Sequence, residues 1–149
     1  MRHLIFMLLS GLLISCNRSE PSPEKVSDAD RVLLEQLKQK EQEKIALLAN
    51  PDPFIVGGKW EKFDKGIIND YTQVTGCEFT NNSKFAVTSI SGNITVYTSK
   101  NVEIGSIPFN AEGVLLAGET KTLKINSGEL SGKGERALFT IKSVKIIGD

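Results

Sequence analysis

Histidine is almost absent from this sequence. The only one is His3, so residues 4–149 contain none. That stretch cannot form a Ser-His-Asp triad, a Cys-His pair, a histidine general base or a histidine-containing zinc site. Most hydrolase mechanisms are thereby excluded. We predict that the protein is not an enzyme and that it has no catalytic residues, no metal site and no cofactor.

Cysteine and net charge are also scarce. The chain has two cysteines, Cys16 and Cys77, and its 18 basic and 18 acidic side chains cancel. Without residues 1–15, which include Arg2, there are 17 basic and 18 acidic side chains, a formal balance of −1. A chain this close to neutral has no strong field to attract nucleic acid or anionic lipid. We therefore predict no nucleic-acid partner.

Residues 1–15 have the layout of a signal peptide. Met1-Arg2-His3 is a positive head, and residues 4–14 are an apolar run too short to span a bilayer, which needs about 20 residues. The run ends in Leu13-Ile14-Ser15-Cys16, which resembles a bacterial lipobox. The resemblance implies cleavage before Cys16 and lipidation of its thiol, and two or three acyl chains hold a protein durably on a membrane. An ordinary signal peptide that happens to contain a cysteine is the alternative.

Residues 16–27 are predicted to be a lipidated tether. They are mostly polar and contain two prolines, a composition that cannot bury enough apolar surface to fold. Fully extended, residues 17–27 span about 36 Å. Residue Asn17 is not the aspartate that retains many lipoproteins of Gram-negative bacteria in the inner membrane. We therefore expect the outer membrane rather than the inner one.

Residues 28–50 are predicted to form a spacer helix. Ser27-Asp28-Ala29-Asp30 fits a capping box, and Asn50-Pro51 ends the helix because a residue before proline is pushed out of the helical region. One heptad-spaced row on this helix consists of Leu34, Leu37, Glu41, Lys44 and Leu48. The charged centre of this row does not support a long coiled coil. The helix is interpreted as a solvated spacer whose apolar ends touch its own domain or a neighbour; a docking helix for a partner protein is the alternative.

Residues 54–149 have the pattern of strands and turns, because β-branched and aromatic residues alternate between glycine, asparagine and serine. Strands are predicted at 59–63, 71–80, 84–98, 102–109, 114–116, 120–126 and 137–147. About seven strands without a helix among them predict one mainly β domain, a single antiparallel β-sandwich preceded by one exposed α-helix. Its core is predicted to contain Trp60, Phe54, Phe63, Phe79, Phe85, Phe109 and Phe139.

Three segments in this domain are similar to those of a known family. They are Asn81-Asn82-Ser83 after a strand, Ile94-Thr95-Val96-Tyr97-Thr98 on a strand, and the turn Leu116-Ala117-Gly118-Glu119-Thr120. With them, Val74–Ile146 resembles the FxLYD-type immunoglobulin-like domain of bacterial envelope lipoproteins. Tyr97 matches the naming motif outright. The resemblance covers about half of the chain and implies an immunoglobulin-like structural or binding module without catalytic residues.

Several groups that could carry chemistry have simpler interpretations. The candidate pairs are Ser131 with Lys133, Ser83 with Lys84, Glu61 with Asp64, and Asp28 with Asp30. Neighbouring strand residues point to opposite faces, and the carboxylate pairs lie in hydrophilic segments typical of surface charge. Ser127–Gly134 lacks the phosphate-loop pattern. It is predicted to be a flexible loop, with a recognition loop as the alternative.

Cys77 is predicted to be a buried, reduced core residue. If Cys16 carries lipid, Cys77 has no partner within the chain, and period-two alternation places it on one strand face with Thr75 and Phe79. A reactive or intermolecular thiol is the alternative. Such a thiol needs nearby positive charge, whereas Glu78 is negative.

These features predict a non-enzymatic lipoprotein anchored in the bacterial cell envelope. Its β-sandwich would act as a binding or structural module in the periplasm or at the cell surface, contacting the cell wall or another envelope protein. The predicted partners are the membrane, through the N-terminal lipid, and that envelope protein. The alternative is a protective lipoprotein that blocks a toxin, phage or secreted enzyme at the membrane.

Overall fold

The computed structural model describes residues 27–65 and 70–148. The predicted signal peptide, the predicted lipid site Cys16 and the tether up to residue 26 lie outside these residues. Within the described ranges, a single helix precedes seven strands. Their bounds are α1 Asp28–Ala49, β1 Ile55–Lys65, β2 Tyr71–Asn81, β3 Val87–Tyr97, β4 Glu103–Ala111, β5 Thr120–Ser127, β6 Glu129–Ser131 and β7 Arg136–Ile146.

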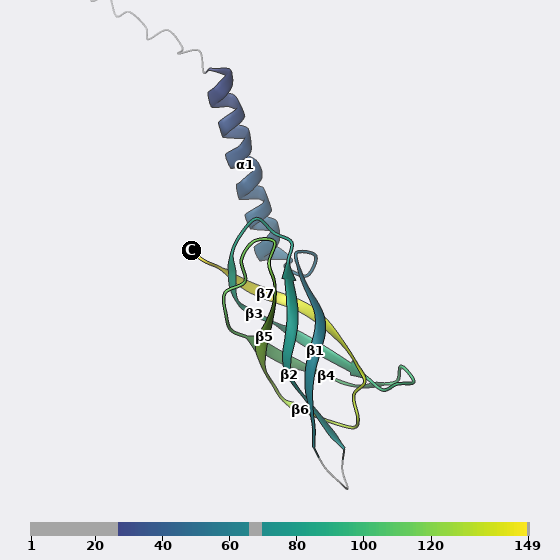
Figure 1. Ribbon diagram of the computed structural model, residues 1–149. Helices are drawn as coiled ribbons and strands as arrows, with labels where there is room; N and C mark the ends of the chain where they lie inside the picture. Colours follow the sequence, from purple (N-terminus) through teal and green to yellow (C-terminus); the bar gives the residue numbers. More distant parts are fainter. Residues whose placement is uncertain (1–26, 66–69, 149) are drawn as a thin grey trace, which may run out of the picture.

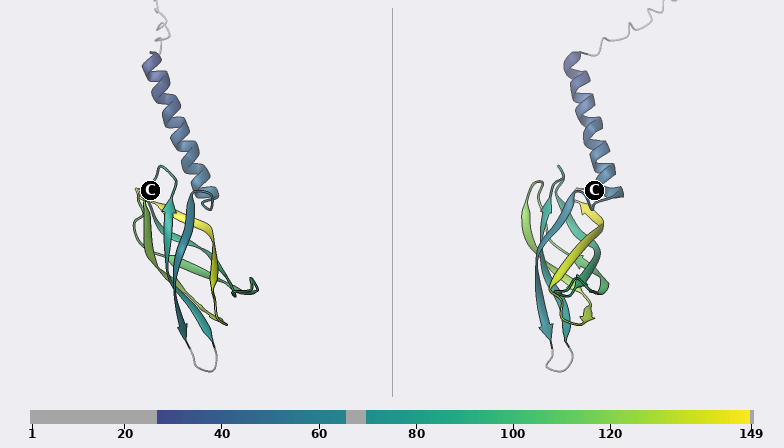
Figure 2. Two further views of the ribbon diagram at one scale, coloured as in Figure 1. Left: turned by 45° about the vertical axis from the view of Figure 1, so that its right-hand side comes forward. Right: turned by 90° about the vertical axis from the view of Figure 1, so that its right-hand side faces the viewer.

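The helix α1 begins and ends as predicted because both ends carry local signals. The Ser27 hydroxyl oxygen accepts a hydrogen bond from the Asp30 backbone N–H at 3.2 Å, and the Asp30 carboxylate accepts one from the Ser27 N–H at 3.3 Å. These two bonds form the predicted capping box. At the other end Asn50 is the C-cap, directly before Pro51. The helix projects away from one end of the β-sheet (Figures 1 and 2).

All seven described strands belong to one antiparallel sheet that curls into a half-barrel. The strand order is β1-β2-β5-β4-β3-β7, and β6 pairs with the free part of β2. The two ends of this order, β1 and β7, approach each other without backbone pairing. Where they meet, Gly57 is so close to Phe139 that an added Cβ would lie 2.7 Å from the Phe139 Cβ. The sheet therefore encloses its own core.

The mainly β fold with antiparallel pairing is confirmed, but two separate sheets are not observed. Strand β5 pairs with β2 over residues 120–124 and with β4 over residues 125–127. Its hydrogen bonds therefore join β1 and β2 to β4, β3 and β7 in one sheet. The predicted strand at 114–116 is only a single bridge, between Leu115 and Val87. A strand that was not predicted, β6, lies inside the stretch that was predicted to be a loop.

Phase slips in the apolar pattern mark bulges in three strands. In β3 the register breaks between Thr88 and Ser91, where Ser89 has φ +54°. In β7 an extra residue lies opposite the step from Ser91 to Gly92 of β3. In β2 the register shifts around Gly76, opposite Glu61. As a result Val74 is buried in place of Thr75, so the prediction that Thr75 shares the Cys77 face was wrong.

Three phenylalanines from different strands form the centre of the core. Phe79 of β2 stacks on Phe109 of β4 at 5.9 Å between ring centroids, and both rings meet Phe139 of β7 edge-on at 5.9 and 5.7 Å. Trp60, Phe54 and Phe85 pack partly buried around this core. Phe63 does not belong to it, contrary to prediction, because 56% of its surface is exposed.

One glycine marks the closest approach between paired strands. A Cβ at Gly92 of β3 would lie 2.0 Å from the Thr140 carbonyl oxygen of β7. No side chain fits there without moving the strand, so the position requires glycine. The alternation that contains Gly92 is otherwise as predicted, with Ile90, Ile94 and Val96 buried beside it.

Candidate functional site

The junction between α1 and the half-barrel fixes the helix to the domain. Leu47 is completely buried in the core cluster, and Pro51 in the following turn is buried too. The Pro51 carbonyl oxygen accepts hydrogen bonds from the N–H groups of Phe54 and Ile55, both at 2.9 Å. One turn of chain therefore connects the helix to β1, and the last turns of α1 belong to the packed domain.

A charged contact adds to this junction. The Glu43 carboxylate accepts a hydrogen bond from the Lys84 backbone N–H at 2.9 Å and pairs with the Lys84 ammonium group at 2.7 Å. The Lys84 side chain, and after it the Lys84 backbone, holds the pKa of Glu43 below its ordinary value. The pair is therefore present at neutral pH and is lost only in acid. Lys40, one turn earlier, places its ammonium group 5.9 Å from the Phe85 ring centroid.

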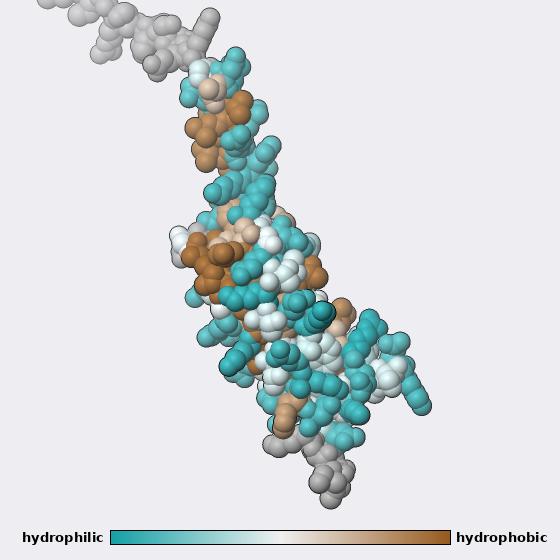
Figure 3. All heavy atoms as spheres, in the orientation of Figure 1, coloured by the Kyte–Doolittle hydropathy of each residue, from teal (hydrophilic) through white to brown (hydrophobic). Residues whose placement is uncertain are grey.

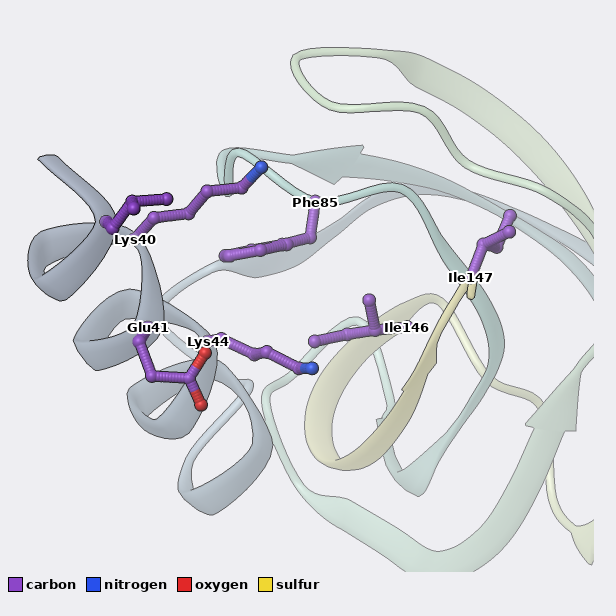
Figure 4. A pocket seen from close by; sticks show the side chains of 7 residues that line it. Lys40, Glu41, Lys44, Phe85, Ile146 and Ile147 are labelled. Atoms are coloured by element: carbon purple, nitrogen blue, oxygen red, sulfur yellow. The ribbon is translucent and has the colours of Figure 1, made fainter. Parts of the chain in front are cut away.

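Two hollows lie at the junction and share residues Ile146 and Ile147 at the end of β7. The first, about 280 Å³, is lined by Leu37, Lys40, Glu41, Lys44, Phe85, Ile146 and Ile147. The second, about 560 Å³ and mainly apolar, is lined by Leu48, Thr88, Val144, Lys145, Ile146, Ile147 and Gly148. Figure 4 shows Lys40 and Lys44 extending from α1 toward Phe85 and Ile146. The junction thus offers concave, largely apolar surface beside the helix.

Residues 28–39 are called the projecting segment of α1, because the N-terminal part of the helix points away from the domain (Figure 1), although Leu37 near the end of this segment also lines the first hollow. This segment has four apolar side chains that are each at least half exposed: Val32, Leu33, Leu34 and Leu37. Figure 3 shows hydrophobic residues gathered on this stretch of the helix, separated by polar residues from those of the domain. A cluster of exposed leucines on a rigid support is typical of a surface that binds another molecule.

The opposite end of the domain is held by a polar network around Thr72, which is buried. The Thr72 hydroxyl oxygen accepts from the Gly134 N–H at 2.7 Å and lies 2.9 Å from the Gly132 carbonyl oxygen. The Lys62 ammonium group donates to the Gly134 carbonyl oxygen and pairs with Asp64 at 2.9 Å. The hydrogen bond from the Lys62 ammonium group to the Asp64 carboxylate lowers the pKa of Asp64.

These contacts correct the prediction of a flexible loop at Ser127–Gly134. The stretch contains β6, and its far end is bound to residues about 60 positions earlier in the chain. Only folding brings those partners together, so the local sequence of the glycine-rich stretch carries no sign of them.

The candidate chemical pairs have other partners in the structure. Ser83 donates to the Asn81 side-chain oxygen at 2.7 Å, whereas Lys84 pairs with Glu43 on α1. Asp30 belongs to the helix cap. Of the remaining groups, Asp64 pairs with Lys62, Lys133 lies 3.8 Å from Glu135, and Glu61 lies against Gly76.

Cys77 is buried, as predicted, and faces the core beside Phe79. Its thiol donates to the Glu78 carbonyl oxygen at 3.3 Å. Burial raises the pKa of the Cys77 thiol from 9.0 to about 12.

We expect Cys77 to react slowly with a thiol reagent in the native protein and rapidly after denaturation. At pH 8 the raised pKa leaves roughly a thousand-fold fewer thiolates than an ordinary cysteine has, and the thiolate is the nucleophile. Both rates are measured by labelling followed by mass spectrometry. One sample is native, and the other is unfolded in about 6 M guanidinium chloride. Equal rates in the two conditions would show that the thiol is accessible and reactive.

Comparison of the chain with protein-family models, characterised proteins and solved structures finds no match. Within the described residues, no helix is long and apolar enough to cross a membrane. The same residues contain no group of three or more histidine, cysteine or acidic side chains that could hold a metal ion. The candidate site consists of the junction and the projecting segment, where apolar hollows lie close to the exposed leucines of α1.

Sequence reasoning missed the junction almost entirely. It recognised the apolar ends of the helix but could not place Glu43 beside Lys84, which is 41 residues later. The only local signal was that Leu47 follows Glu43 and Lys40 at helical spacing, which puts all three on one face.

Proposed function

We propose that this protein is a non-enzymatic lipoprotein of the bacterial envelope, anchored through Cys16, that presents a protein-binding surface on α1 and the adjoining domain. The observation that carries the binding function is the projecting segment, where Leu33, Leu34 and Leu37 are half exposed on a helix whose other end is fixed in the core. A rigid support limits the entropy that a partner must remove on binding. The anchor is supported by Leu13-Ile14-Ser15-Cys16.

We propose further that the domain is an immunoglobulin-like module. Support comes from the two halves of the curled sheet, β1-β2-β5 and β4-β3-β7, which face each other across the phenylalanine core. Each half contributes rings to that core: Phe79 comes from the first half, and Phe109 and Phe139 from the second. In this interpretation β5 is the strand that passes from one layer to the other.

We expect Cys16→Ala to move the protein from the membrane fraction to the soluble fraction. The substitution removes the thiol that would receive the lipid, and the remaining charge is too balanced to hold the chain on a lipid surface. Fractionation of cells that produce either form, followed by immunoblotting, measures the distribution. Cys77→Ala is the matched control and should leave the distribution unchanged. Equal partitioning of wild type and Cys16→Ala would disprove the anchor.

Purification of the lipidated protein from its own membranes, followed by identification of bound proteins, tests the binding function. We expect specific partners that are lost from a Leu33→Ser, Leu34→Ser variant, because both side chains are exposed and do not belong to the core. Partners that are retained by this variant would place the binding surface elsewhere on the domain. A toxin, phage protein or secreted enzyme among the partners would favour the protective function.

A further inference from the structure

A row of neutral polar side chains crosses the outer side of the sheet. Asn126 of β5 pairs with Asn110 of β4, which in turn pairs with Ser91 of β3, and Ser91 pairs with Ser143 of β7. Paired residues of neighbouring strands point to the same face, and Asn110 follows the buried Phe109, so the row points away from the core. With the next outward pair along β3 and β7, this row makes up the polar face: Ser91, Asn93, Asn110, Asn126, Thr140 and Ser143.

A hollow of about 420 Å³ opens on the polar face where β4 meets β5. It is lined by Asn110, Glu112, Lys124, Ile125 and Asn126. Its volume is within the range of about 300–1,000 Å³ that small-molecule sites have. Each of the two side-chain amides offers N–H donors and a carbonyl acceptor, and the opposite charges of Glu112 and Lys124 leave the lining without net charge.

The hydroxyl groups of the polar face are held in fixed positions by their neighbours. The Ser91 and Ser143 hydroxyl oxygens are 2.7 Å apart, and in the adjoining row Thr95 donates to Ser106 at 3.2 Å. Each hydroxyl of a pair keeps part of its hydrogen-bonding capacity, because a hydroxyl has one donor and two acceptor positions. The sheet therefore presents a regular array of groups that both donate and accept, with little entropy left to lose on binding.

The chemistry of the polar face favours a sugar over other classes of ligand. Protein interfaces concentrate aromatic, methionine and arginine side chains at their centre, and the six residues of the polar face include none. Nucleic acids and anionic lipids require clustered positive charge. Lysines lie only at two borders of the face, where Lys142 is the extra residue of β7 and Lys124 lies with Glu112. Sugar hydroxyls, like those of the face, are both donors and acceptors.

We propose that the polar face binds a neutral glycan and that the hollow beside Asn110 and Asn126 holds one of its sugar units. The sugar hydroxyls exchange hydrogen bonds with the two amides, and the glycan continues along the row over Ser91 and Ser143. This inference goes beyond the proposed function, because the polar face lies on the sheet and uses no residue of α1.

Titration of the full-length protein with two neutral glycans tests the proposal. One probe is a soluble oligosaccharide of N-acetylglucosamine, which has hydroxyl and amide groups, and the other is dextran, which has hydroxyl groups without amides. We expect the first probe to bind, with the same affinity in about 1 M salt, where the Debye length is about 3 Å. Binding of dextran as well would assign recognition to the hydroxyls alone. Binding of neither probe, or loss of binding in salt, would overturn the proposal.

Substitution of the two amides tests the position of the site. We expect the Asn110→Ala, Asn126→Ala variant to weaken glycan binding at least about ten-fold, because it removes two groups that each donate and accept. Asn126→Asp keeps the side-chain shape but loses the N–H donors, so it should weaken binding too. Thr122→Ala is the matched control, because Thr122 is also exposed on β5 but does not line the hollow.

The outcomes separate this site from the surface on α1. The Leu33→Ser, Leu34→Ser variant should bind the glycan as the wild type does, because neither leucine belongs to the polar face. Equal affinity of the wild type and the Asn110→Ala, Asn126→Ala variant would overturn the proposed site. That result would leave the proposed protein-binding function intact, since the latter is measured by the partners that the leucine variant loses.

Discussion

Replacing Phe79 by alanine is expected to destabilise the protein by about 3–5 kcal/mol, the range for aromatic residues deleted from a packed core. Phe79 is completely buried and contacts Phe109 and Phe139, so its removal opens a cavity between the two halves of the curled sheet. A domain of this size has a free energy of unfolding of about 5–15 kcal/mol. The variant should therefore be close to the limit of folding. Urea denaturation followed by the fluorescence of Trp60, the single tryptophan, measures the change.

Phe63→Ala is the matched control for this experiment. Phe63 was expected in the same core, but it lies exposed near the end of β1, so its loss should change the free energy of unfolding by less than about 0.5 kcal/mol. Equal effects of the two substitutions would mean that the end of the β1–β2 hairpin packs as tightly as the phenylalanine core. A small effect at Phe79 would contradict the described core.

The elements that could be predicted are those with signals in neighbouring residues. The capping box at Ser27–Asp30 and the Asn50-Pro51 stop fixed both ends of α1. Alternation in 90–96 identified the buried face of β3, and the phase slips located bulges. In each case the residues that determine the structure lie within a few positions of each other.

The features that could not be predicted depend on partners far along the chain. Nothing local in 120–127 shows that β5 pairs with β2 at one end and with β4 at the other, which is the difference between a single curled sheet and a two-sheet sandwich. Likewise β6 exists only because residues 129–131 meet the free part of β2. Periodicity reports which face of a strand is buried, but not which strand lies beside it.

The candidate site also has one part that could be predicted from the sequence and one part that could not. The exposed leucines of the projecting segment were visible as an apolar end of the helix, and the charged centre of the row was visible as well. The interpretation of the two apolar ends of the helix changed once the structure showed that only the C-terminal turns of α1 are packed on the domain. The apolar end near Leu47 is then explained by the core, whereas the apolar end near Leu34 is left without a partner in the described chain.

Replacing Leu47 by alanine is expected to lower the free energy of unfolding by about 2–5 kcal/mol, because this completely buried side chain is enclosed by the core cluster. The interpretation of residues 28–50 as a solvated spacer implies that 54–149 fold independently of the helix. The packing of Leu47 predicts instead that the last turns of α1 unfold together with the sheet. A chain lacking residues 17–50 should therefore lose at least the stability that Leu47→Ala loses.

Leu48→Ala separates packing of the helix end from a general effect on helix formation. Leu48 is the next residue, has the same intrinsic helix propensity as Leu47, and is 45% exposed, so its substitution should cost less than about 1 kcal/mol. Urea denaturation is followed by Trp60 fluorescence for the sheet and by circular dichroism at about 222 nm for the helix, because coincident transitions of two probes are the test for one cooperative unit. Coincident transitions shifted by Leu47→Ala but not by Leu48→Ala would show that helix and sheet form one cooperative unit. If Leu47→Ala melted the helix early while the fluorescence transition stayed in place, 54–149 would be an independent domain and α1 a spacer that only rests on it.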